Sequence, residues 1–305
     1  MTTLLPAGLH FFERGWLSSN AIFLDDGVSS VLIDTGYVTH SSLLMTFLAS
    51  HLHERSLDIL VNTHLHSDHC GGNLAVQSHF LKVKTFIPFG LFDAVRDWNE
   101  NLLSFESTGQ SCPRFQVDAQ LLPGEVYNWA SFYWEVHASP GHDHDALLLF
   151  NPEYRILISA DALWANGFGV VFPEICGGTG FAEVSSTLDL IEKLNPKIVL
   201  PGHGPVIEDL PTAISIARAK IKRFKESPSL HASHAAKVLL KFKLLEWQSV
   251  DHSDLELWAL NTPLLMDVHQ TFFSSVSMSI WIDDLVSELV SKKVARLDGL
   301  KLLNM

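Results

Sequence analysis

The segment from Thr63 to Gly72, THLHSDHCGG, constrains the fold of this chain more than any other. It places four side chains of metal-ligand type within six positions, directly after the apolar run at 58–62 that predicts a buried strand. Imidazole and carboxylate together suit zinc, iron or manganese. Because a regular strand or helix cannot aim four such neighbours at one ion, we expect a turn that fans them toward two adjacent sites. A polar loop with incidental histidines is the alternative, although the full His-x-His-x-Asp-His string is far more specific than a single His-x-His.

Three further segments place a ligand-type residue at the carboxyl end of an apolar run. They are His142 in SPGHDHDALLL, Asp161 in RILISADAL and His203 in KIVLPGHGP. Loops converge where buried strands end, and binding sites are built there. Taken singly, His203 is open to interpretation as a turn histidine and Asp161 as a helix cap. As a set, the three complete the seven ligands that a two-metal site needs.

The chain predicts a strand-rich α/β body followed by a helical tail. Expected strands lie at 9–12, 21–24, 31–34, 58–62, 83–87, 133–138, 146–150, 155–159 and 197–200. Expected helices lie at 40–54, 73–80, 90–103 and 182–194 in the body, and at 211–226, 230–247, 262–275 and 280–292 in the tail. Asp298-Gly299 between apolar runs predicts a closing hairpin. We therefore expect a catalytic domain over 1–210 and a helical, winged-helix-like domain over 211–305.

Composition excludes several classes of protein. The start of the chain lacks the pattern of a secretory signal, and no run of about 18 apolar residues predicts a membrane span, so we expect a cytoplasmic protein without a membrane partner. The 3 cysteines form no CxxC pair, which argues against a disulfide framework. Residues 1–209 carry 24 acidic against 9 basic side chains, so a nucleic-acid partner is not expected.

The ordered residues His64-x-His66-x-Asp68-His69, His142, Asp161 and His203 resemble the motif series of the metallo-β-lactamase superfamily over roughly residues 9–207. The resemblance implies an αβ/βα sandwich with two divalent metal ions at one edge, zinc first and iron or manganese as alternatives. It assigns ligands by position: His64, His66 and His142 to the first ion; Asp68, His69 and His203 to the second; and Asp161 to both. Asp34 in LIDTG resembles the aspartate that supports the site in this family.

The same resemblance narrows the chemistry. Histidine at 66 and 69 and aspartate at 161 are similar to the hydroxyacylglutathione hydrolase, lactonase and phosphodiesterase branches. It implies hydrolysis of a small ester-like bond, a thioester ahead of a lactone, by a hydroxide that bridges the two ions, with Asp68 orienting the nucleophile. Two alternatives stay open. One is a phosphodiesterase or RNase-type hydrolase, and the other is a metal-binding regulator with little turnover.

The glycine-rich stretch at 165–180 predicts a long loop near the site. Trp164, Phe168 and Phe172 border or lie in this loop and are candidates for contact with a small-molecule substrate, or else they pack the loop down. By similarity to family members with comparable tails, the tail is expected to cover the entrance of the site or to mediate a homodimer.

Overall fold

The computed structural model describes residues 4–305. Contacts divide the described chain into two compact units. Unit 1 comprises residues up to 103 together with 112–222, and unit 2 comprises 104–111 together with 223–305. The division by contacts thus falls inside helix α7 (Leu210–Glu226). The division into a catalytic domain over 1–210 and a helical domain over 211–305, which the sequence suggests, remains a prediction.

Unit 1 contains a sheet whose strands lie side by side in chain order. They are β1 (Leu9–Phe12), β2 (Ala21–Asp25), β3 (Ser30–Ile33), β4 (Ile59–Val61), β5 (Lys84–Pro88) and β6 (Ala119–Leu121). The first three strands pair antiparallel, and the pairs from β3 to β6 are parallel. Because β3 and β4 are parallel neighbours, the residues that follow them, Asp34 and the segment from Asn62, emerge at the same edge.

A second sheet in unit 1 has the order β11-β10-β9-β8-β7. Its strands are β7 (Val126–Trp129), β8 (Phe132–Ala138), β9 (Leu147–Asn151), β10 (Ile156–Ala160) and β11 (Ile198–Pro201). Strands β10 and β11 are parallel, so Asp161 and the turn at 201–204 also leave the sheet at one edge. The register shifts between Ile158 and Ala160, and Ala160 has a left-handed φ of 46°, a local irregularity of the kind found beside functional sites.

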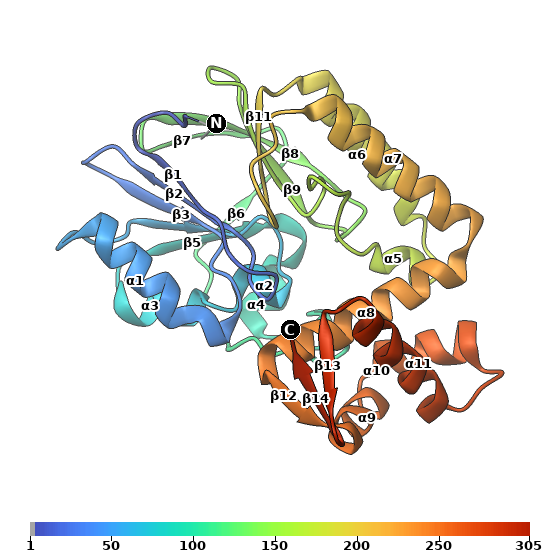
Figure 1. Cartoon of the computed structure of the whole chain (residues 1–305). Helices are drawn as coiled ribbons and strands as arrows, with labels where there is room; N and C mark the ends of the chain where they lie inside the picture. The colour runs from blue at the N-terminus through green and yellow to red at the C-terminus, as the bar shows by residue number, and fades with distance from the viewer. Residues whose placement is uncertain (1–3) are drawn as a thin grey trace. The chain divides into compact units, whose positions relative to one another are not determined.

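The core of unit 1 lies between the two sheets. Alternation along β2 shows how the sequence builds it, because Ile22 and Leu24 pack toward the second sheet while Ala21 and Phe23 belong to a separate cluster. That second cluster includes Leu44 and other residues of α1 (Ser41–Leu52) and reaches α3 (Asn73–His79). In Figure 1 these two helices lie outside the first sheet, and α6 (Gly180–Leu194) and α7 lie outside the second. The layers are those of the expected αβ/βα sandwich.

Short helical turns connect these layers. They are η1 (Val38–His40), α2 (Ser67–Cys70), η2 (Phe89–Leu91), α4 (Phe92–Asp97) and α5 (Phe172–Ile175). The helix expected at 90–103 is shorter than predicted, because Trp98 adopts a left-handed conformation that ends α4. Helix α5 lies inside the stretch expected to be a loop, so that stretch is partly ordered.

Unit 2 contains four α-helices and a small sheet within its described residues. Its elements are α8 (Pro228–Trp247), β12 (Ser249–Asp251), α9 (His252–Leu260), α10 (Pro263–Val268), the π-helix η3 (His269–Phe273), α11 (Met278–Ser291), β13 (Ala295–Asp298) and β14 (Lys301–Asn304). The last two strands form the expected hairpin, with Gly299 at a φ of 63°, and β12 pairs with β14 as a third strand. Helix α9 was missed by the sequence interpretation, since LELWAL shows no clear helical period. Within residues 4–305, none of the helices has the length and apolarity needed to cross a bilayer.

Candidate metal centre

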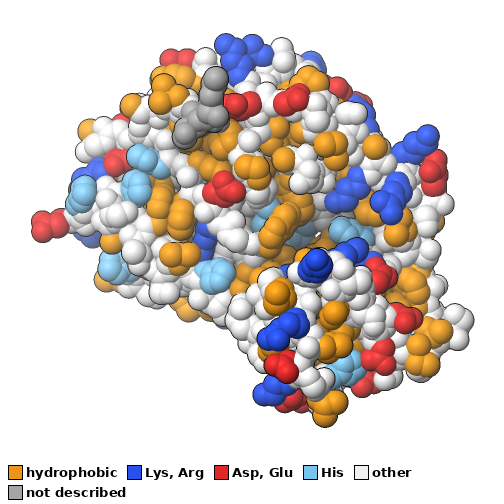
Figure 2. Space-filling model, in the orientation of Figure 1, with side chains coloured by type: hydrophobic (Ala, Val, Ile, Leu, Met, Phe, Trp, Pro, Cys, Tyr) orange, Lys and Arg blue, Asp and Glu red, His pale blue; other side chains and the backbone are white. Residues whose placement is uncertain are grey.

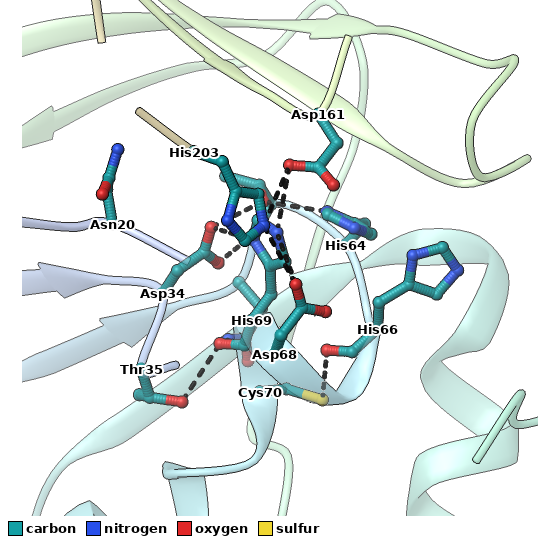
Figure 3. A network of polar contacts seen from close by, with 12 residues as sticks. Asn20, Asp34, Thr35, His64, His66, Asp68, His69, Cys70, Asp161 and His203 are labelled. Atoms are coloured by element: carbon teal, nitrogen blue, oxygen red, sulfur yellow. Dashed lines mark hydrogen bonds and ion pairs between the residues drawn. The ribbon is translucent and has the colours of Figure 1, made fainter. Parts of the chain in front are cut away.

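The seven residues predicted as ligands come together at one edge of unit 1. They form two groups, His64 with His66 and His142, and Asp68 with His69, Asp161 and His203. Within each group, the candidate ligand atoms lie within 4.8 Å of one another. In Figure 3, Asp161 and His203 from the second sheet face Asp68 and His69, which follow the first sheet. A cluster of histidines does not by itself identify a metal site, because histidine side chains also gather on the surface over α1 in Figure 2.

A turn and a single helical turn direct the first four of these side chains. The chain leaves β4 at Asn62, turns, and enters α2, where the amide of His69 donates to the carbonyl of His66 over 2.9 Å. The Asn62 side chain closes the turn by donating to the carbonyl of His69 over 3.1 Å. This backbone path lets adjacent residues diverge, so that His64 and His66 join one group while Asp68 and His69 join the other.

Asp34 orients two of the histidines. Its Oδ2 lies 2.7 Å from Nδ1 of His69 and also accepts from the Thr63 hydroxyl over 2.7 Å. The Thr63 oxygen in turn lies 3.2 Å from Nδ1 of His64. With Nδ1 engaged in both rings, Nε2 is the nitrogen that faces the site. Asp34 is buried with a left-handed φ of 60°, so the backbone is held in an uncommon conformation to place this carboxylate.

Asp161 lies between the two groups. One of its oxygens is 3.2 Å from Nε2 of His69 and 3.8 Å from Nε2 of His203, and the other is 3.3 Å from Nε2 of His142. His142 is oriented by the carbonyl of Val170, which accepts from Nδ1 over 2.5 Å. The carboxylate therefore faces histidines of both groups with different oxygens.

One close contact joins two side chains within each group. Nε2 of His142 faces Nδ1 of His66 over 2.8 Å. Nε2 of His203 lies 3.0 Å from Oδ2 of Asp68. A residue that the sequence interpretation did not include, Asp143, has its Oδ2 3.6 Å from Nε2 of His66.

The electrostatics of the two groups differ. Burial lowers the pKa of His64 well below its usual value, and it lowers the pKa of His142 to about 4, so both rings are neutral near pH 7. Burial alone would lower the pKa of His69, but the Asp34 and Asp161 carboxylates raise it well above its usual value. Burial alone would raise the pKa of Asp161, but His69 and His203 hold it well below. One group thus offers neutral imidazoles, and the other combines carboxylates with histidine.

These residues fit a divalent cation. Nε2 of His64 is buried and has no hydrogen-bond partner among residues 4–305, although a buried polar atom is normally satisfied. It belongs to a set of three imidazoles that lie within reach of one point, which is the donor set of a transition-metal site. The second group adds carboxylate oxygens to imidazole, a donor mixture that also suits such ions. The His and Asp clusters therefore form a site for divalent metal ions.

The three aromatic residues named from the loop sequence have different surroundings. The Phe172 ring is perpendicular to the His66 ring, with ring centroids 5.7 Å apart, and the centroid of the Trp164 ring lies 5.1 Å from that of His203. Phe168 is only 1 % exposed and has the Lys220 ammonium 4.8 Å above its ring. Phe168 thus packs the loop down, the second of the two interpretations that the sequence left open.

Two residues near the cluster carry no signal in the sequence. Asn20 donates from Nδ2 to the carbonyls of Pro201 and Gly204, each over 2.9 Å. These two hydrogen bonds stabilise the turn that contains His203. Trp16 stacks on the His203 ring at 5.5 Å with an interplanar angle of 6°. Both residues lie in the connection between β1 and β2, far before His203 in the chain. Only the fold brings them to the site.

Comparison with known proteins agrees with this geometry. A model of the metallo-beta-lactamase superfamily matches residues 14–203. The beta-lactamase-like protein 2 homolog of Caenorhabditis elegans is 29% identical over 193 residues, covering 62% of this chain and 57% of that protein. The human acyl-coenzyme A thioesterase MBLAC2 is 26% identical over 213 residues, covering 63% of this chain and 75% of that protein.

Among solved structures, a metallo-beta-lactamase family protein from Thermus thermophilus has a similar fold. Its TM-score is 0.57 at 18% identity, and the match covers 99% of this chain and 100% of that one. The chain spans less than two thirds of the length of its C. elegans relative. Since the family model matches well over half of the sequence, and since the matched segment supplies all seven clustered side chains, this protein belongs to the metallo-beta-lactamase superfamily.

Proposed function

We propose that this protein is a metal-dependent hydrolase that binds two divalent metal ions and cleaves a small ester-like bond. Zinc is the preferred candidate for the metal, and a thioester is preferred to a lactone as the bond that is cleaved. The observation that carries the proposal is the position of Asp161 between two adjacent ligand groups, with one oxygen toward His69 and the other toward His142. A carboxylate in this position suits a pair of ions better than a single one.

In this proposal each group holds one ion. His64, His66 and His142 hold the first, and Asp68, His69 and His203 hold the second, with Asp161 shared. Bound divalent ions supply a hydroxide near neutral pH and stabilise the negative charge that develops on the scissile group. Asp34 fixes the ligand nitrogen of His69 directly and that of His64 through Thr63.

Asp68 has a second role in the proposal. Its Oδ2 contacts His203, and the side chain is buried within the second group. A carboxylate there is positioned to orient the nucleophile and to accept its proton. Substitution by asparagine would keep the shape and the ligand oxygen but remove the base.

The preference for a thioester rests on similarity. The human relative is named as an acyl-coenzyme A thioesterase, and its match to this chain covers 63% of it. The excess of acidic side chains in residues 1–209 argues against a nucleic acid as the substrate, because its phosphate backbone would be repelled. The substrate that we propose is therefore a thioester whose acyl group is small and uncharged.

A hydrolase panel with verified metal content tests the proposal. Protein loaded with zinc, and separately with iron or manganese, is assayed on a thioester, a lactone, a simple ester and bis-p-nitrophenyl phosphate. We expect the thioester to be cleaved with the largest kcat/KM, and Asp68→Asn to lose most of the rate even when excess metal keeps both sites loaded. Faster cleavage of the phosphodiester would overturn the substrate assignment. A metal-loaded protein inactive on all four bonds would instead indicate a binding or regulatory protein.

A further inference from the structure

An exposed tryptophan stands against the ligand cluster. Trp16 has 54 % of its surface exposed, although a large aromatic side chain gains most by burial. It stacks nearly parallel on His203, and Trp164 contacts it edge-on with ring centroids 5.4 Å apart. A ring that is both solvent-exposed and stacked on a residue of the metal centre offers its surface to whatever binds there.

The backbone around Trp16 is held in place. The amide of Ser19 donates to the carbonyl of Asp68 over 2.9 Å, and the amide of Asn20 donates to the carbonyl of Gly202 over 2.6 Å. Leu17, the next residue after Trp16, is buried. The loop is therefore tied to the same backbone segments that carry Asp68 and His203. Trp16 is presented by a fixed support, which limits the entropy lost when a ligand packs on it.

Trp164 is fixed as well. Its indole Nε1 donates to Oδ1 of Asp161 over 3.2 Å, and its ring contacts His203 edge-on. The two indoles thus form an edge-to-face pair beside Asp161 and His203, an arrangement that aromatic rings favour. The polar atom of Trp164 is engaged with Asp161, so its carbon surface is what remains for contact with a ligand.

We propose that Trp16, supported by Trp164, determines substrate specificity by binding the apolar acyl or aryl group next to the scissile bond. This inference rests on the proposed thioester hydrolysis. It adds that the enzyme recognises the substrate by its acyl or aryl group. A flat or extended apolar group suits an exposed indole face, whereas a short acetyl group is too small to cover it. Trp16 is thus a specificity residue and takes no part in proton transfer.

The test compares Trp16→Ala and Trp16→Phe with the wild type on acetyl, hexanoyl and benzoyl thioesters of one common thiol. Tyr133→Ala is the matched control, because Tyr133 lies on β8 and has the same exposed fraction, 54 %. We expect Trp16→Ala to raise KM about tenfold for the hexanoyl and benzoyl thioesters relative to the acetyl thioester. Tyr133→Ala should leave metal content and KM unchanged for all three thioesters, and Trp16→Phe should recover most of the preference.

A binding measurement separates this inference from the proposed function. Calorimetry with the benzyl thioether of the same thiol, which cannot be hydrolysed, should show binding about tenfold weaker for Trp16→Ala and unchanged for Tyr133→Ala. If no thioester is cleaved but this difference is found, the proposed function fails while the binding role of Trp16 stands. Equal losses for all three acyl groups, loss of metal, or no binding of the thioether to the wild type would each overturn the inference.

Discussion

Replacement of Asn20 should weaken the metal site that contains His203. Asn20 is fully buried and uses every polar atom of its side chain, donating to the carbonyls of Pro201 and Gly204 and accepting from the amide of Arg14 over 2.8 Å. Asn20→Ala leaves these three partners without their bond, at a cost of about 1 kcal/mol or more each, so we expect a loss of about 3–5 kcal/mol in the free energy of unfolding. Urea denaturation measures this loss.

The effect on metal is the discriminating readout. With the turn at 201–204 released, His203 should lose its fixed position, and the affinity for the second ion should fall about 10- to 100-fold while the first ion stays bound. Asn151→Ala is the matched control, because Asn151 is equally buried, donates to the carbonyl of Tyr133 over 3.0 Å and accepts from the amide of Tyr154. It should lose stability without losing metal. If Asn20→Ala bound both ions as tightly as Asn151→Ala does, Asn20 would not position His203.

The remaining predictions concern three other side chains. Asp161→Ala should bind fewer ions by elemental analysis and nearly abolish turnover while its circular dichroism stays native; normal rate with both ions bound would contradict the bridging role. Asp34→Asn should lower metal affinity about 10- to 100-fold, since His69 loses the carboxylate on Nδ1, and an unchanged affinity in competition with a chelator would refute this. Burial lowers the pKa of Lys220 to about 8. Between pH 8 and about 10.5 the unfolded chain therefore binds more protons than the folded one. Over this range the free energy of unfolding should rise by up to about 3 kcal/mol relative to that of Lys220→Met. Parallel pH profiles of the two proteins would show that Lys220 is not buried in solution.

The strand ends that carry ligands were predictable, and the reason is local. Apolar runs at 58–62, 155–159 and 197–200 are each followed closely by a ligand-type residue, and they correspond to β4, β10 and β11. Strand and turn signals are encoded in adjacent residues, so the sequence alone could place these residues at sheet edges. Which sheet edges meet was implied by the family resemblance, because periodicity carries no information about contacts between distant segments.

Contacts made by unremarkable residues were not predictable. Nothing adjacent to Trp16 or Asn20 distinguishes them from other loop residues. Their roles arise from the packing of the two sheets, which brings the β1–β2 connection to the turn after β11. Phe168 shows the reverse case. An aromatic residue in a glycine-rich stretch suggested substrate contact or packing, and only its burial beneath Lys220 decides between them.

The central claim is that two adjacent ligand groups share Asp161 and bind two ions. Elemental analysis of protein loaded with zinc and dialysed to equilibrium tests it most directly, with His64→Ala measured in parallel because this change removes a ligand from the first group alone. We predict two ions per chain for the wild type and one for His64→Ala. One ion in both proteins, or none in the wild type, would contradict the account.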